Sequence, residues 1–393
     1  MQAGMQSERD DAAVATNRRT RFDLLDAMKG LAACVVVWHH LTCYAPGSDL
    51  ADLTAPTLRA WLYDEATFVV QIFFVIGGFA LVTALSTQAL GPRQALQALI
   101  CRYIRLAAPY LAMLGMLLAA AWLTSQLIVK PPLISSFSWG QLLAHLFFLQ
   151  DVLGLGNFAA GTWYLCIDIQ YALLFLILSV CVFHVQQRQW VSWPAHTIQA
   201  SVLAALGLVS MWYWNRIPQL DCYIIYFLSS MVLGSLLAWT LQGRLPKWLI
   251  VLYALSMTAS LIVDYRPRLV VALVTAAIIA IGLTSFSAIR IPRCLVWLGR
   301  ISYSLFLIHY LVNGLVLYAV NPWIGDSPVR ALLAETFAFA CSLVAAIGLY
   351  YAVEVPTHRW LKKVQRRSVD DPATAPQRSS VTASQVGLPS VAS

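Results

Sequence analysis

Two adjacent histidines lie inside the apolar stretch "MKGLAACVVVWHHL", which runs from residue 28 to residue 41. An imidazole can act as a general base or as a nucleophile near neutral pH. Lys29 precedes His40 by eleven residues, so a helix would bring the two side chains about 20° apart on one face, roughly 16 Å apart along its axis. His39 would point about 80° away, and we expect it to pack or to support. Lys29 and His40 are therefore the first candidates for chemistry.

A second candidate is the arginine pair in "CRYIRLAAPY". Arg102 and Arg105 are three residues apart and would face the same way on a helix. Two guanidinium groups on one face form a clamp for phosphate, which suits a nucleotide-bearing cofactor. Arginines at the inner edge of a membrane span also serve as topology anchors, so that alternative stays open.

Further polar residues interrupt other apolar segments. Asp168 lies in "GTWYLCIDIQYALLF", at a depth similar to that of His40. A carboxylate there is costly without a partner, so we expect it to meet a histidine, a hydroxyl or a substrate. Ser302, His309 and Asn313 form a polar stripe in "LGRISYSLFLIHYLVNG". Hydrogen bonding between helices is the alternative to a catalytic role for that stripe.

We expect the helices that carry these residues to cross a membrane, because the 393-residue chain is 60% hydrophobic and only 11% charged. The composition predicts an all-α polytopic membrane protein with about ten transmembrane helices. The apolar segments that are long enough run roughly over residues 28–45, 66–88, 103–129, 162–185, 198–215, 222–242, 246–263, 269–286, 300–320 and 331–353.

The distribution of positive charge predicts the orientation. If the amino terminus is cytoplasmic, the inner side holds all but six of the 26 lysines and arginines; the outer six are Arg59, Lys130, Arg216, Arg266, Arg268 and Arg330. Positive residues concentrate on the cytoplasmic side of membrane proteins, so both termini are predicted to be cytoplasmic. The same asymmetry explains the net charge of +8 without nucleic acid as a partner.

We expect three parts in the chain: a polar cytoplasmic tail over 1–20, a transmembrane domain over 21–363 and a disordered cytoplasmic tail over 364–393. The segment "WGQLLAHLFFLQDVL" is too short for a span and is predicted to be an interfacial or re-entrant helix. The eight cysteines are scattered without C-x-x-C or Cys/His spacing, so we expect packing roles and no metal site.

Six segments in order resemble motifs of one family. They are "RFDLLDAMKGLAACVVVWHH", with a basic residue followed after ten residues by a histidine, "FFVIGGFALVTAL", "CRYIRLAAPY", "TWYLCIDIQY", "LGRISYSLFLIHYLV" and "YYAVEVPTHRW". From residue 21 to about 363 the chain resembles the acyltransferase 3 family of integral membrane O-acyltransferases, which modify bacterial polysaccharides and other cell-surface or secreted acceptors.

Three residues depart from the pattern of that family. Gly77 replaces the usual serine of the second motif, and Asp168 replaces a glutamate, which keeps the charge and shortens its reach. Lys29 stands where arginine is frequent, and lysine cannot bind phosphate in the bidentate manner of arginine.

The resemblance implies a donor and a location. The donor would be cytoplasmic acyl-CoA, most often acetyl-CoA, and the protein would lie in the cell inner membrane as a multi-pass enzyme without a metal. Arg102 and Arg105, helped by Lys29, would bind the CoA phosphates and direct the pantetheine arm into the bundle.

The resemblance also assigns roles near the thioester. His40 would act either as general base on an acceptor hydroxyl or as a transient acyl carrier, and both roles stay open. Asp168 would orient His40 or the acceptor. A tetrahedral oxyanion would be stabilised by hydrogen-bond donors, for which the candidates are Trp163, Ser302 and His309.

The expected partners are membrane lipid and a glycan acceptor, such as a surface polysaccharide. The identity of the acceptor, a homo-oligomeric state and association with polysaccharide biosynthesis proteins stay open. One alternative is a proton-coupled transporter or exporter of a sugar or lipid-linked sugar, since buried His and Asp also suit such a carrier. Another is a non-catalytic membrane subunit of a polysaccharide synthase.

Overall fold

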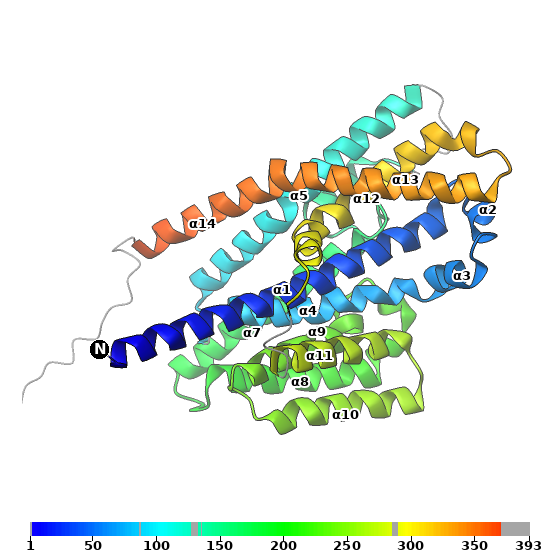
Figure 1. Ribbon diagram of the computed structural model, residues 1–393. Helices are drawn as coiled ribbons and strands as arrows, with labels where there is room; N and C mark the ends of the chain where they lie inside the picture. The colour runs from blue at the N-terminus through cyan, green and yellow to red at the C-terminus, as the bar shows by residue number, and fades with distance from the viewer. Residues whose placement is uncertain (1, 86–87, 127–132, 135, 285–289, 371–393) are drawn as a thin grey trace, which may run out of the picture.

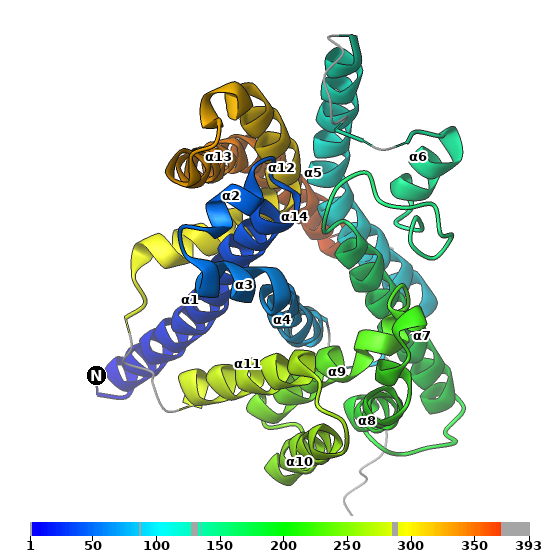
Figure 2. The same ribbon diagram turned by 90° about the vertical axis from the view of Figure 1, so that its right-hand side faces the viewer.

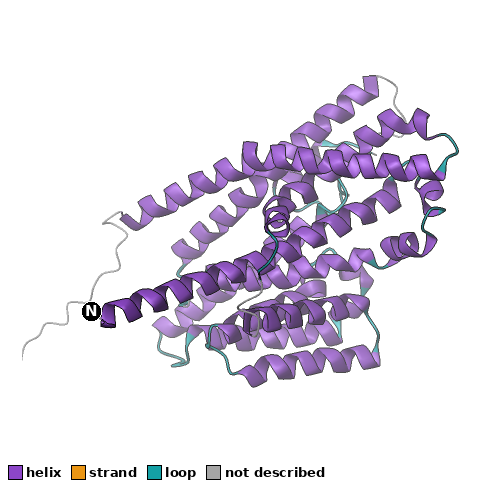
Figure 3. Ribbon diagram, viewed as in Figure 1, coloured by secondary structure: helices purple, strands orange, loops and turns teal. Residues whose placement is uncertain are grey.

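The computed structural model describes residues 2–85, 88–126, 133–134, 136–284 and 290–370, and all regular structure in these ranges is helical (Figure 3). The α-helices are α1 (Gln2–Tyr44), α2 (Ser48–Asp52), α3 (Pro56–Asp64), α4 (Val70–Ala84), α5 (Pro92–Gln126), α6 (Trp139–Leu146), α7 (Trp163–Gln187), α8 (Ala195–Trp212), α9 (Ile224–Leu241), α10 (Lys247–Val263), α11 (Pro267–Thr284), α12 (Arg293–Ile324), α13 (Pro328–Leu349) and α14 (Val355–Asp370). Short 3₁₀ turns cover Ala66–Val69, Trp214–Arg216 and Pro218–Leu220, and a π-helical turn, η4, covers Tyr350–Glu354.

The helices confirm a polytopic membrane protein. In the described part of the chain, nine helical segments are long and apolar enough to cross a membrane. The tenth predicted span is α10, an apolar helix of 17 residues. Each of the ten apolar segments therefore corresponds to one helix of the bundle.

Several helices extend beyond the apolar segments that predict them. The helix α1 begins at Gln2 and includes the predicted polar tail, while α5 begins at Pro92 rather than near residue 103. Polar residues such as Arg, Gln and Glu are good helix formers, so a helix continues past the apolar part of its sequence. For the same reason residues 364–370, predicted to be disordered, belong to α14, whereas 371–393 lie outside the described residues. The helix predicted between α5 and α7 is confined to the eight residues of α6.

The helices form two groups around two apolar cores (Figure 2). One core is built mainly from α4, α8, α9, α10 and α11, and nearly every residue of α9 is buried in it. The other is built from α1, α5, α12 and α13, and α7 contributes to both. The amino terminus of α1 lies at one end of the bundle, which we call the amino-terminal end; α2 and α3 cover the other, which we call the capped end (Figure 1).

Glycines permit close crossings in both groups. A Cβ on Gly299 of α12 would lie 1.9 Å from the Asp26 carbonyl oxygen of α1, and a Cβ on Gly234 of α9 would lie 1.9 Å from the Val75 carbonyl oxygen of α4. Small residues let helix backbones approach closely within a membrane, where packing replaces the hydrophobic effect as the driving force. The first of these crossings holds α1 directly against α12.

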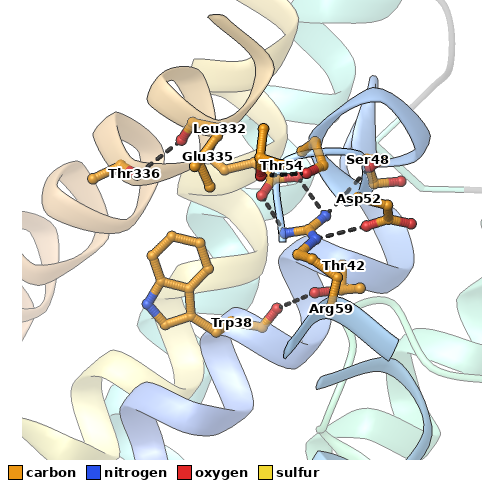
Figure 4. A network of polar contacts seen from close by, with 10 residues as sticks. Trp38, Thr42, Ser48, Asp52, Thr54, Arg59, Leu332, Glu335 and Thr336 are labelled. Atoms are coloured by element: carbon orange, nitrogen blue, oxygen red, sulfur yellow. Dashed lines mark hydrogen bonds and ion pairs between the residues drawn. The ribbon is translucent and has the colours of Figure 1, made fainter. Parts of the chain in front are cut away.

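A buried ion-pair network fixes the capped end to the bundle (Figure 4). Arg59 of α3 donates to Asp52 of α2 at 2.6 Å and to both carboxylate oxygens of Glu335 of α13 at 2.5 and 3.1 Å. Arg59 and Glu335 are only 3% and 1% exposed. Removing one partner would leave the other charge buried and unpaired, so this network holds α2 and α3 in place.

Candidate active site

Two imidazoles lie against each other inside the bundle. His40 belongs to α1 and His309 to α12, and the distance between His40 Nδ1 and His309 Nε2 is 2.7 Å. The two rings stack with 5.0 Å between their centroids, and His309 is fully buried. His309, which we expected to stabilise an oxyanion, is instead the direct hydrogen-bond partner of the predicted base.

The bonds of His309 define which nitrogen of His40 carries the proton. His309 Nδ1 lies 3.1 Å from the carbonyl oxygen of Leu305, and because a carbonyl oxygen only accepts, this nitrogen must donate. In a neutral imidazole the other nitrogen then accepts, so His309 Nε2 receives the N–H of His40 Nδ1. His40 Nε2 is left with a free lone pair, which is the form that a base or a nucleophile needs.

The surroundings of His40 separate it from its sequence neighbour. His39 donates from Nδ1 to the Leu62 carbonyl oxygen of α3 at 2.7 Å, so it connects α1 to the capped end. Gly161, just before α7, packs on the imidazole of His40. Its φ is +84°, and a Cβ there would lie 3.0 Å from the Phe306 ring and 3.6 Å from His40 Cε1. This position requires glycine both for its backbone conformation and for the close approach.

The predicted donor-binding residues share one cavity. Lys29, Arg102 and Arg105 all line a cavity of about 370 Å³, which we call the basic cavity. Lys29 forms an ion pair with Asp26 at 2.8 Å, whereas Arg105 forms no ion pair or hydrogen bond with any described residue. The structure thus brings together residues from α1 and α5 that the sequence places more than seventy positions apart.

Asp168 also lines the basic cavity, but its partner differs from the expected one. Its carboxylate accepts two hydrogen bonds from Arg102, at 2.6 and 3.2 Å, and is nearly buried. Asp168 therefore contacts Arg102 and not His40, because the α5 guanidinium satisfies both of its oxygens; that it orients the acceptor stays a prediction. Asp168 instead holds Arg102 in a bidentate geometry and neutralises one of the two arginine charges.

The basic cavity is also lined by Arg300, Glu354 and His358, for which no role was predicted from the sequence. Glu354 ends the π-helical turn η4 and accepts a hydrogen bond from Ser304 at 2.8 Å. π-helical turns often mark functional sites, since they redirect a side chain out of the helical register. The same rule that selected Asp168, a carboxylate inside an apolar segment, also applies to Glu354 in "YYAVEVPTHRW".

The other predicted oxyanion donors lie apart from His40. Ser302 lines the basic cavity and donates to the Gly299 carbonyl oxygen of its own helix at 2.7 Å. Trp163 faces a different cavity and stacks on Phe227. Gly77, at the position where the family carries serine, lies in the basic cavity, and a Cβ there would be 3.7 Å from Asp168 Oδ1 and from the Tyr164 hydroxyl.

The imidazole pair lies between two cavities. On one side Phe306 lines the basic cavity, and its ring centroid lies 6.3 Å from that of His309. On the other side His40 and His309 line a smaller cavity of about 100 Å³, together with Tyr44 and Asn313. A group that enters the basic cavity and passes Phe306 would therefore reach the imidazole pair.

The bundle of membrane-spanning helices thus holds a buried imidazole pair next to a cavity lined by several basic residues, which is a candidate active site. Residues 22–353 match the acyltransferase domain that defines the acyltransferase 3 family. The chain therefore belongs to the acyltransferase 3 family, and its general activity is acyl transfer. No curated protein matches the chain, and no solved structure matches it either.

Proposed function

We propose that the protein transfers an acyl group, most simply acetyl, from cytoplasmic acyl-CoA to a hydroxyl of a glycan outside the cytoplasm. The protein would span the cell inner membrane with both termini in the cytoplasm, an orientation supported by the distribution of lysine and arginine. The basic cavity would then open toward the cytoplasm, where acyl-CoA is made.

The donor site is supported by two neighbouring cavities that share two arginines. The basic cavity and a second cavity of about 290 Å³ are both lined by Arg102, Arg105 and His358, and the second also by Lys362. Phosphate groups of CoA would bind the two arginines and Lys362 at the mouth. The pantetheine arm is uncharged and would extend into the basic cavity toward Phe306.

His40 would act as the general base. Its Nε2 takes the proton of the acceptor hydroxyl while the hydroxyl oxygen attacks the thioester carbonyl carbon, so that a C–O bond forms. The tetrahedral intermediate then collapses, the C–S bond breaks, and the CoA thiolate takes the proton back from Nε2. His309 would orient the ring and stabilise the imidazolium, as the third residue of a catalytic triad does.

The observation that carries this proposal is the position of the His40–His309 pair directly beyond Phe306 and the basic cavity. A test uses purified protein in lipid vesicles, radiolabelled acetyl-CoA and an O-deacylated surface polysaccharide. We expect alkali-labile label on the polysaccharide with the wild type and a loss of about 10²- to 10⁴-fold with His40→Ala. Near-normal transfer by His40→Ala would remove His40 from the chemistry.

The acyl-histidine route makes a different prediction in the same system. If His40 carried the acyl group, the protein would become labelled when acetyl-CoA is supplied without acceptor. Direct base catalysis predicts no covalent label on the wild type and no release of CoA before the acceptor is added.

A further inference from the structure

A fourth cavity, of about 420 Å³, is lined by residues at or just before the beginnings of α4, α7, α9 and α11. These helices begin at the capped end of the bundle (Figure 1). None of the residues that line this cavity lines the basic cavity or the cavity of the imidazole pair. Its size falls within the range of about 300–1,000 Å³ that small-molecule sites occupy. The mechanism described above does not use it, so its chemistry needs a separate explanation.

Aromatic rings form one wall of this cavity, which we call the aromatic cavity. Trp163 and Phe227 stack with 5.6 Å between their centroids and 28° between their planes. Tyr226 lies beside Phe227 at 4.9 Å, edge to face. Flat apolar surfaces of this kind match the C–H face of a pyranose ring.

Donors and acceptors of hydrogen bonds line the rest of the aromatic cavity. Asp151 and Asp221 offer oxygens, while Arg268 and the amide of Gln71 offer N–H groups. A sugar ring carries hydroxyls that both donate and accept, so it can satisfy both sets. A purely apolar ligand or a simple anion would leave one set unpaired.

Two buried atoms at this cavity have no hydrogen-bond partner. Arg268 Nε is buried and donates to no described residue, although its guanidinium lies 4.6 Å from the centre of the Tyr226 ring. Asp151 Oδ2 is also buried and accepts no N–H or O–H bond, whereas Oδ1 accepts from Asn157 Nδ2 at 2.6 Å, and the Cys166 thiol is a weak further donor to this carboxylate. Buried polar atoms are rarely left unpaired, so Arg268 Nε points to a ligand that supplies an acceptor, and a ligand hydroxyl would be a stronger donor to Asp151 than the thiol.

The aromatic cavity connects to the imidazole pair through one short segment. Asn157 and Trp163 line the cavity, Thr162 donates to Asn157 Oδ1 at 2.6 Å, and Gly161 between them packs on His40. A glycan bound in this cavity would lie just across this segment from the base.

We propose, on the basis of the proposed function, that the aromatic cavity binds a sugar unit of the acceptor glycan. One unit stacks on the Trp163–Phe227 wall and bonds to Arg268 and Asp151. Another unit of the same chain then presents its hydroxyl to His40. The cavity would therefore determine which glycan is acylated.

The test measures glycan binding separately from turnover. Full-length His40→Ala protein in detergent is mixed with short oligosaccharides cut from the host's O-deacylated surface polysaccharide, and saturation-transfer NMR reports binding. Adding Trp163→Ala should weaken binding about tenfold or more, the loss typical of a central aromatic contact. Asp221→Asn serves as a second variant, since Asp221 is exposed and its replacement leaves packing intact. Trp139→Ala is the matched control, because that tryptophan is 78% exposed and lines no described cavity.

Two outcomes separate this inference from the proposed function. If the oligosaccharide binds and Trp163→Ala or Asp221→Asn weakens it, the sugar site is supported even if the wild type transfers no acyl group. If the wild type acylates the glycan but both variants bind it as tightly as the Trp139→Ala control, the inference is overturned and the proposed function stands.

Discussion

Replacing His309 tests whether its hydrogen bond prepares His40 for proton transfer. Methionine and glutamine have nearly the same shape, but only glutamine offers an oxygen that can accept the N–H of His40 Nδ1. In His309→Met that N–H is left buried without an acceptor, at a cost of about 1–3 kcal/mol. If the transition state bears this cost, kcat should fall roughly 5- to 150-fold, since 1.36 kcal/mol is tenfold in rate. His309→Gln should recover most of that loss.

The assay is steady-state acetyl transfer to O-deacylated polysaccharide at saturating acetyl-CoA. The KM for acetyl-CoA should stay close to the wild-type value, because His309 does not line the basic cavity. Thermal unfolding of each variant in detergent serves as the control for folding.

Two results would refute the reasoning about His309. A folded His309→Met protein with a kcat within about twofold of the wild type would show that the hydrogen bond to His40 has no orienting role. Equal losses in the Met and Gln variants would show that the volume of His309 matters and its acceptor nitrogen does not.

Three further predictions follow from other contacts. Arg105→Gln should raise the KM for acyl-CoA roughly tenfold or more with little change in kcat, since it removes an unpaired cation from the donor site; an unchanged KM would contradict the clamp. Gly299→Ala should lower the free energy of unfolding by about 1–3 kcal/mol because its Cβ would collide with the backbone of α1, whereas Gly348→Ala, with open space around its Cβ, should not. Burial lowers the pKa of His145 from 6.5 to about 4. Between these two values of pH the locally unfolded segment 139–161 binds a proton that the folded segment does not bind, so protonation favours unfolding. The amides of 139–161 should therefore lose up to about 3 kcal/mol of protection from hydrogen exchange as the pH falls from 6.5 to 4. His145→Phe should remove that dependence on pH, and an unchanged profile would contradict the assignment.

Periodicity and composition predicted the fold well, because each span is recognised from its own sequence. Ten apolar segments correspond to ten helices, and only their ends differ, as with α1 and α5. The residue at which a helix ends depends on where its polar last turn frays in water or at a membrane surface. The hydropathy of the sequence does not predict that residue. The prediction that Lys29 and His40 lie on one helix is also confirmed, because both residues belong to the continuous helix α1.

Contacts between helices were harder to predict from one sequence. Asp168 and His40 share a similar depth, yet Asp168 pairs with Arg102 because α5 packs on α7 at that level. The partnership of His40 with His309 depends on the crossing of α1 and α12 at Gly299, which no spacing within either helix reveals. The spans themselves are thus predictable from the sequence, whereas the direction in which each side chain faces within the bundle depends on how the helices pack.

The separation of the cavities also bears on the transporter alternative. A carrier exposes one substrate site alternately to each side of the membrane, so the residues of that site must serve both openings. Here the basic cavity and the aromatic cavity share no lining residue, and Gly161 and Phe306 pack together beside His40 between them. If the basic cavity holds the proposed donor and the aromatic cavity the proposed glycan, only an acyl group needs to pass the histidine pair. Two separate cavities of this kind favour an enzyme that joins two substrates over a carrier that moves one substrate through.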